Sequence, residues 1–168
     1  MRIYLGADHS VDEVKRQITT HLETRGYNVV DCGAAAENAD FYPAFCLLTA
    51  GQVVGDLGSL GIVLGREGNE EQIAANKVLG ARCALGWSVQ AAQFARAHYD
   101  AQLISIGTQI HSADEVLAIV DAFVGAVWSV DEADYKRIDI LTQYEINRQE
   151  AHTQRILAGV RASEAGVS

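Results

Sequence analysis

The stretch Gly61-Ile62-Val63-Leu64-Gly65 is an unbroken apolar run, and the polar segment Arg66-Glu67-Gly68-Asn69-Glu70-Glu71 follows it directly. A short run of this kind, in which polar and apolar residues do not alternate, is typical of a strand buried on both faces. A helical pattern begins near Glu70 and runs into Ile73-Ala74-Ala75-Asn76. The stretch therefore predicts a buried strand, a loop and a helix, in that order.

The same alternation of strands and helices extends along the chain in both directions. Further short strands are predicted at residues 3–6, 28–31, 83–85 and 103–106. Helices are predicted from residue 11 to a stop at Gly26, and at 40–54, 88–97, 113–127 and 133–158. Apolar strands separated by helices form a parallel sheet covered on both faces. The predicted fold class is α/β, a three-layer sandwich with a Rossmann-like, five-stranded parallel sheet and a long C-terminal helix.

Two of these helices carry apolar stripes that we expect to face the core. In the helix at 40–54 the stripe consists of Phe45, Leu48 and Val53. In the helix at 113–127 it consists of Val116, Leu117, Val120, Phe123, Val124 and Val127. Both stripes follow the spacing of residues on one helical face.

The 168 residues suffice for one domain with its own core, and no segment has the composition of a linker. A single domain over 1–168 is therefore expected, with a polar helical tail from about residue 145. The formal charge of −9 argues against a nucleic-acid partner or an anionic membrane surface. No apolar stretch approaches the ~18 residues of a membrane span. A cytoplasmic protein is expected, with three reduced, structural cysteines: Cys32, Cys46 and Cys83.

Polar residues gather where the predicted strands end. Ligands of parallel sheets bind beyond the carboxyl ends of the strands, and we expect four groups of residues there. They are Asp8-His9, Gly65 to Glu71, His98, and Gln109-Ile110-His111. Each group also has a purely structural interpretation: a helix N-cap, an acidic first helical turn, or a histidine at a helix C-terminus. His21 and His152 are expected at the surface, and no local spacing of histidines and carboxylates suggests a metal site.

Several blocks of the sequence resemble a known family. The blocks are Leu5-Gly6-Ala7-Asp8-His9, Tyr42-Pro43-Ala44-Phe45-Cys46, Gly61-Ile62-Val63-Leu64-Gly65, Glu71-Gln72-Ile73-Ala74-Ala75-Asn76-Lys77 and Gly80-Ala81-Arg82-Cys83-Ala84-Leu85. In this order and spacing they resemble the ribose-5-phosphate isomerase B and galactose-6-phosphate isomerase family, in its actinobacterial branch. The resemblance runs from Met1 to about Tyr144.

The resemblance implies an aldose–ketose isomerase of carbohydrate and pentose phosphate metabolism that works through a cis-enediolate, without a metal or any other cofactor. The substrate would be a sugar or sugar phosphate. The protein would be a homodimer, or a tetramer, whose sites draw residues from two subunits. The proton-transferring base of this branch falls on Glu71, because the cysteine base of the other branch would fall on Gly65. The acid/base that opens the sugar ring falls on His98.

The resemblance also assigns the substrate-binding residues. Asp8 and His9 match residues that bind hydroxyls or phosphate, and Tyr42 matches a residue that lines the pocket. The backbone of the Gly65–Glu70 loop matches an anion hole. The full set is Asp8, His9, Tyr42, Gly65, Glu67, Gly68, Asn69, Glu70, Tyr99, Gln109 and Arg137.

The departures from the family concentrate at this site. Residues 66, 67 and 70 replace glycine, a small hydroxyl residue and glycine, and Glu70 would be strained if its φ were positive. Gln109 replaces an arginine of the phosphate side, and in the tail Ala133 and Asp134 replace an arginine and a histidine, which leaves Arg137. We therefore expect a substrate other than ribose 5-phosphate, either another sugar phosphate or an unphosphorylated sugar. The alternatives are a weak or inactive paralogue with a binding role, and one subunit of a hetero-oligomer.

Overall fold

The structure is a computed structural model that describes residues 1–7, 11–33 and 42–165. Asp8 and His9 lie outside these residues, and so does the side chain of Tyr42. The chain divides into two compact units, Met1–Ser129 and Val130–Ser168. The larger unit holds the sheet, and the smaller one consists mainly of a single helix.

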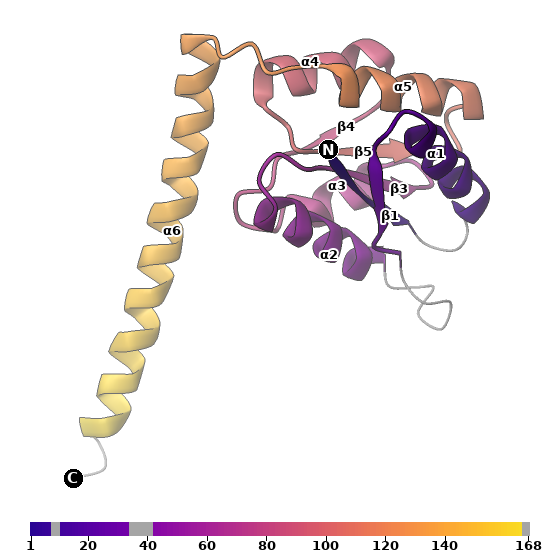
Figure 1. The fold of residues 1–168 in the computed structure, drawn as a ribbon. Helices are drawn as coiled ribbons and strands as arrows, with labels where there is room; N and C mark the ends of the chain where they lie inside the picture. Colours follow the sequence, from indigo (N-terminus) through magenta and orange to yellow (C-terminus); the bar gives the residue numbers. More distant parts are fainter. Residues whose placement is uncertain (8–10, 34–41, 166–168) are drawn as a thin grey trace. The chain divides into compact units, whose positions relative to one another are not determined.

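Five parallel strands form one sheet in the order β2-β1-β3-β5-β4 (Figure 1). The strands are β1 (Arg2–Ala7), β2 (Asn28–Asp31), β3 (Leu60–Gly65), β4 (Cys83–Leu85) and β5 (Leu103–Gly107). The helices are α1 (Asp12–Thr24), α2 (Tyr42–Gly55), α3 (Asn69–Ala75), α4 (Val89–Tyr99), α5 (Ala113–Gly125) and α6 (Glu132–Ala165). The α/β class and the five parallel strands that the sequence predicts are confirmed.

Two apolar clusters, one on each face of the sheet, make the core. One joins the sheet to α1, α4 and α5, through residues such as Ile18, Ala95 and Phe123. The other joins the opposite face to α2 and α3, through Phe45 and Ala75. Because every strand of the central part is covered on both faces, continuous apolar runs are what the fold requires there.

Three side chains differ from their predicted positions. Leu48 is 50% exposed, although Phe45 on the same helix is buried. Val127 is 80% exposed, because α5 ends at Gly125 and Ala126 is extended. His21 is half-buried, and its Nε2 lies 2.7 Å from Oδ1 of Asp121 on α5, so it links two helices rather than facing solvent.

The strand order creates a topological switch point between β1 and β3. The chain leaves β1 through α1 on one face of the sheet, and leaves β3 through α3 on the other face. Connections that diverge in this way leave a crevice beyond the carboxyl ends of the two strands. The loop from Gly65 to Gly68 lies at this end of β3, so the fold places it where such sheets bind ligands.

The second unit is dominated by α6, which has 34 residues. Asp131 caps its start, because its Oδ1 accepts hydrogen bonds from the N–H groups of Ala133 at 2.9 Å and Asp134 at 3.3 Å. In the first turns, Arg137 pairs with Asp134 at 2.6 Å. Among the described residues, no helix is both long and apolar enough to cross a membrane.

Candidate active site

The loop between β3 and α3 depends on Gly68. Its φ is +88°, a left-handed conformation that disfavours any residue with a side chain. A Cβ at this position would also lie 2.8 Å from Cδ1 of Leu85. On β5, a Cβ on Gly107 would lie 2.7 Å from the Cα of Glu67, so the two segments pack backbone to backbone.

Hydrogen bonds from the β5 side hold the carbonyl groups of this loop. Gly65 O accepts from the backbone N of Thr108 at 2.8 Å and from its Oγ1 at 3.1 Å. Arg66 O accepts from the N of Gln109 at 2.9 Å, and Gly68 O accepts from Oγ of the buried Ser105 at 2.6 Å. In a trans peptide the next N–H points opposite to the carbonyl. The N–H groups that follow these carbonyls therefore point away from β5.

The carboxylate of Glu71 is buried at the carboxyl end of β3. The residue is only 4% exposed, although it lies in the first turn of α3. Its carboxyl group lies directly over the Cα of Gly65, so that a Cβ on Gly65 would overlap the Glu71 oxygens. The buried carboxylate of Glu71 thus occupies the space that the missing side chain of Gly65 leaves at the end of β3.

A pocket of about 430 Å³ opens beside Glu71. Its lining residues come from the loop, the start of α3 and the segment after β5: Arg66, Glu67, Glu70, Glu71, Gln109 and Ile110. Four of these were predicted individually as site residues, whereas Arg66 and Ile110 were expected at this edge of the sheet only as parts of longer segments. Among the described lining residues, three carboxylates and one guanidinium face the same space.

The strain predicted for Glu70 is absent. Among the described residues, positive φ values at residues other than glycine occur only at Asp100 and Val130. Glu70 lies inside α3, because the helix begins at Asn69, and its backbone is helical. Gly68 alone takes the left-handed turn of this loop, so a glycine at position 70 is not required.

His98 lies at the opposite edge of the sheet from Glu71, contrary to its predicted place at the carboxyl ends. β4 and β5 are parallel, so α4 must run from the carboxyl edge back to the amino edge. His98 is in the last turn of α4, just before β5 begins. β3 has six residues at about 3.3 Å each, so a strand length separates the two side chains within one chain.

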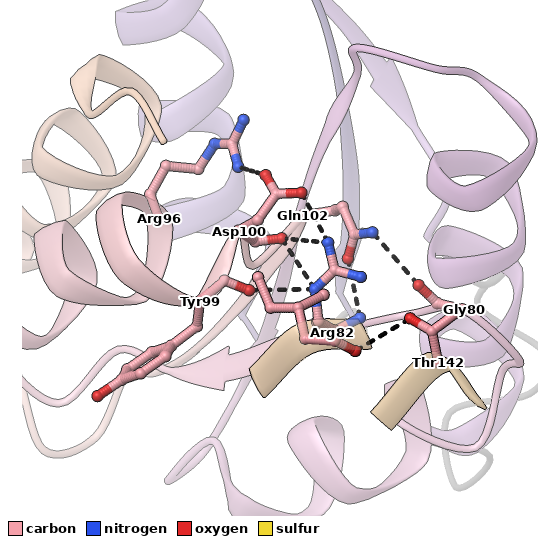
Figure 2. Close-up of polar contacts among 8 residues, drawn as sticks. Gly80, Arg82, Arg96, Tyr99, Asp100, Gln102 and Thr142 are labelled. Carbon is pink, nitrogen blue, oxygen red and sulfur yellow. Dashed lines mark hydrogen bonds and ion pairs between the residues drawn. The ribbon is translucent and has the colours of Figure 1, made fainter. Parts of the chain in front are cut away.

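A cluster around Arg82 confirms this placement, because Arg82 directly precedes β4 (Figure 2). Its Nε donates to Tyr99 O and Asp100 O, each at 3.1 Å, and its Nη2 donates to Oδ2 of Asp100 at 2.8 Å. Arg96 pairs with the other oxygen of Asp100. The cluster ties the end of α4 to the start of β4, and the Tyr99 ring points away from it. His98, in the last turn of α4 next to this cluster, is exposed.

Two residues of the resembling blocks have structural roles next to the site. The side chain of Asn76 forms two hydrogen bonds with the backbone of Cys83, as a neighbouring strand would. Its Nδ2 donates to Cys83 O at 2.8 Å, and its Oδ1 accepts from Cys83 N at 2.9 Å. Burial raises the pKa of the Cys83 thiol far above its usual value, and the charge of Glu71 raises it further. Cys83 is therefore a neutral thiol, as the prediction of structural cysteines requires.

Comparisons with known proteins match this arrangement. The sequence pattern of the Ribose/Galactose Isomerase family matches residues 3–141. The chain belongs to this family. It is 57% identical over 150 residues to "Ribose-5-phosphate isomerase B" of Mycolicibacterium paratuberculosis, which covers 89% of this chain and 94% of that one. It is 58% identical over 146 residues to the protein of the same name from Mycobacterium tuberculosis, covering 86% and 90%.

Among solved structures, the ribose-5-phosphate isomerase B of Mycoplasma genitalium with bound ribulose-5-phosphate superposes with a TM-score of 0.80 at 33% identity. The match covers 86% of this chain and 95% of that one. As a member of the ribose/galactose isomerase family, the chain is an aldose–ketose isomerase by class. Its Arg137 lies in the second unit, and Asp8 and His9 lie outside the described residues.

Proposed function

We propose that the chain interconverts an aldose and a ketose at the pocket beside β3, with Glu71 as the base that carries the proton between C1 and C2. The observation that carries this proposal is the buried carboxylate of Glu71, held over Gly65 in the wall of the pocket. Burial disfavours the charged form of a carboxyl group and so increases its strength as a base. One carboxyl group can take the proton from one carbon and return it to the other.

The loop backbone from Gly65 to Glu70 is proposed to stabilise the cis-enediolate. Its carbonyl groups at Gly65, Arg66 and Gly68 are held on the β5 side, which supports N–H groups aimed at the crevice. Donors that are already oriented lower the energy of a developing oxyanion, typically by a few kcal/mol. Asp8 and His9 remain proposed to bind hydroxyl groups or the phosphate of the substrate, and Tyr42 remains proposed to line the pocket.

His98 is proposed to open the sugar ring in the site of a second copy of the chain. Its position supports this, because within one chain His98 and Glu71 lie at opposite edges of the sheet. Large apolar side chains accompany it on the exposed part of α4 and just before it: Trp87, Val89, Phe94 and Tyr99. An exposed apolar patch of this kind is typical of a surface that another chain covers. We propose a homodimer, or a tetramer built from it, with shared sites.

The deciding experiment combines two inactive variants. Glu71→Gln and His98→Ala are purified separately, and solvent-proton exchange into a cyclic aldose is followed by NMR. Each variant alone should be slow. After mixing and subunit exchange, hetero-oligomers contain one site with both native residues, so activity should return to a fraction of that of the native protein. An unimpaired Glu71→Gln would remove the proposed base, and a mixture that stays inactive would contradict the shared site.

The substrate is proposed to differ from ribose 5-phosphate. Among the described residues, three carboxylates line the pocket against one guanidinium, and Gln109 stands where the resembling family has an arginine, which leaves fewer cations to bind a phosphate dianion. The names of the relatives point the other way, since they are ribose-5-phosphate isomerases. A screen of tetroses, pentoses and hexoses, with and without phosphate, distinguishes a shifted substrate from ribose 5-phosphate. Brisk turnover of ribose 5-phosphate, with KM up to about 1 mM, would refute the shift. Tight binding without turnover of any sugar would favour a binding role.

A further inference from the structure

We infer that Arg66 binds an anionic group of the substrate and has taken over this task from position 109. The inference rests on the proposed function, because it concerns the substrate of the same pocket. It narrows that proposal to sugars that carry an anionic group, in practice a phosphate.

The structure brings the side chains of Arg66 and Gln109 together, although 43 positions separate them in sequence. Nε of Arg66 lies 3.4 Å from Oε1 of Gln109, and the backbone N of Gln109 donates to Arg66 O at 2.9 Å. The backbone bond fixes the two segments side by side, where β3 and β5 end. A cation on residue 66 therefore reaches the space beside residue 109, where the resembling family has its arginine.

Arg66 keeps most of its hydrogen-bonding capacity for a ligand. A guanidinium carries five N–H donors, and the contact with Gln109 uses one. Glu67 and Glu70 line the same pocket, yet within the described residues Arg66 forms no ion pair with either of them. Guanidinium groups bind phosphate oxygens through two parallel hydrogen bonds, so the remaining donors suit this ligand.

Because of the charge of the pocket, binding of an anionic group depends strongly on Arg66. Among the described residues that line the pocket it is the single cation, against three carboxylates. Without it, the described lining residues would offer no cation to a phosphorylated sugar. A neutral sugar would depend far less on the guanidinium, because its hydroxyl groups can donate to carboxylates.

The test compares ribose 5-phosphate with ribose in four proteins: the native chain, Arg66→Gln, the double variant Arg66→Gly with Gln109→Arg, and Arg16→Gln. The ratio of kcat/KM for the phosphorylated over the unphosphorylated sugar should fall about 10- to 100-fold in Arg66→Gln. The double variant returns the cation to position 109 and should restore the ratio. Arg16 lies on the exposed part of α1, paired with Glu13, so its variant controls for net charge alone.

A binding measurement keeps the test valid if neither sugar is turned over. Calorimetry with 4-phosphoerythronate and with erythronate, whose carboxylate resembles the enediolate, yields the same comparison as a ratio of Kd values. An unchanged ratio in Arg66→Gln, or an equal fall in Arg16→Gln, would overturn the role of Arg66. Absence of turnover together with an Arg66-dependent Kd ratio would instead contradict the proposed isomerase activity and leave the anion site standing.

Discussion

The carboxylate of Glu71 occupies the space in which a side chain on Gly65 would lie. The two residues belong to different elements, since Gly65 ends β3 and Glu71 is in the first turn of α3. Gly65 has no positive φ, so its missing side chain matters for space and not for backbone conformation. Any larger residue at position 65 must displace the proposed base.

Gly65→Ala should therefore lower kcat strongly while leaving the fold intact. The added methyl group pushes the Glu71 carboxylate away from its place, and a shift of about 1 Å in a reacting group can cost about 100-fold in rate. Steady-state kinetics on the best substrate of the screen measures the effect, and circular dichroism checks the fold. Native-like kcat in Gly65→Ala would mean that the position of Glu71 is not critical.

Gly51→Ala is the matched glycine variant, and we expect it to stabilise the protein. Gly51 lies within α2, and nothing lies within 4 Å of a Cβ added there. Alanine in a helix interior is favoured over glycine by up to about 1 kcal/mol. Urea denaturation should show a higher midpoint with an unchanged slope. A lower midpoint would contradict the open space at Gly51.

Asp100→Ala should be clearly destabilising, because it removes the partner of two arginines. Arg82 and Arg96 both pair with this carboxylate, and all three side chains are about one-fifth to one-quarter exposed. Their partial exposure to solvent weakens the ion pairs, so a loss of about 1–3 kcal/mol is expected, left-handed strain included. Asp100 has φ +43°, which glycine and asparagine tolerate better than alanine.

Two further variants separate these causes. Asp100→Gly keeps the backbone relaxed and loses the carboxylate, so it should be less destabilising than Asp100→Ala. Asp100→Asn keeps one acceptor oxygen and tolerates the left-handed conformation, so it should be the mildest of the three. Equal free energies of unfolding for all three variants would contradict the contribution of backbone strain.

Alkaline pH should destabilise the protein through Cys83. Burial raises the pKa of this thiol in the folded state, whereas the unfolded chain has the ordinary value of about 8.5–9. Above that value the unfolded state releases a proton that the folded state keeps, so the free energy of unfolding falls as the pH rises. Between pH 8 and 10.5, Cys83→Ala should lose stability less steeply than the native chain. If the free energy of unfolding falls equally steeply with pH in both proteins, Cys83 does not contribute to the loss of stability.

Local sequence determined the elements of this protein, whereas the proposed base was assigned by the resemblance to a known family. Apolar runs without alternation identified the central strands, because a strand buried on both faces needs an apolar residue at every position, whereas the edge strand β2 has only two half-buried valines between polar residues. The stop at Gly26 and the start of α3 beside Gly68 were also recognisable, since both depend on backbone conformations within a few residues. Leu48 and Val127 were misplaced, because periodicity does not reveal where the covering surface ends.

Only the tertiary structure decided which of these elements are neighbours. The order β2-β1-β3-β5-β4 places Gln109 beside Arg66, and the parallel pairing of β4 with β5 carries His98 to the opposite edge from Glu71. The overlap of the Glu71 carboxylate with the side-chain position of Gly65 likewise depends on how α3 packs against the end of β3. Spacing along a chain reports which face of an element is buried, whereas the distance between two side chains of different elements depends on how the strands pair. The chemistry of the pocket arises from that pairing.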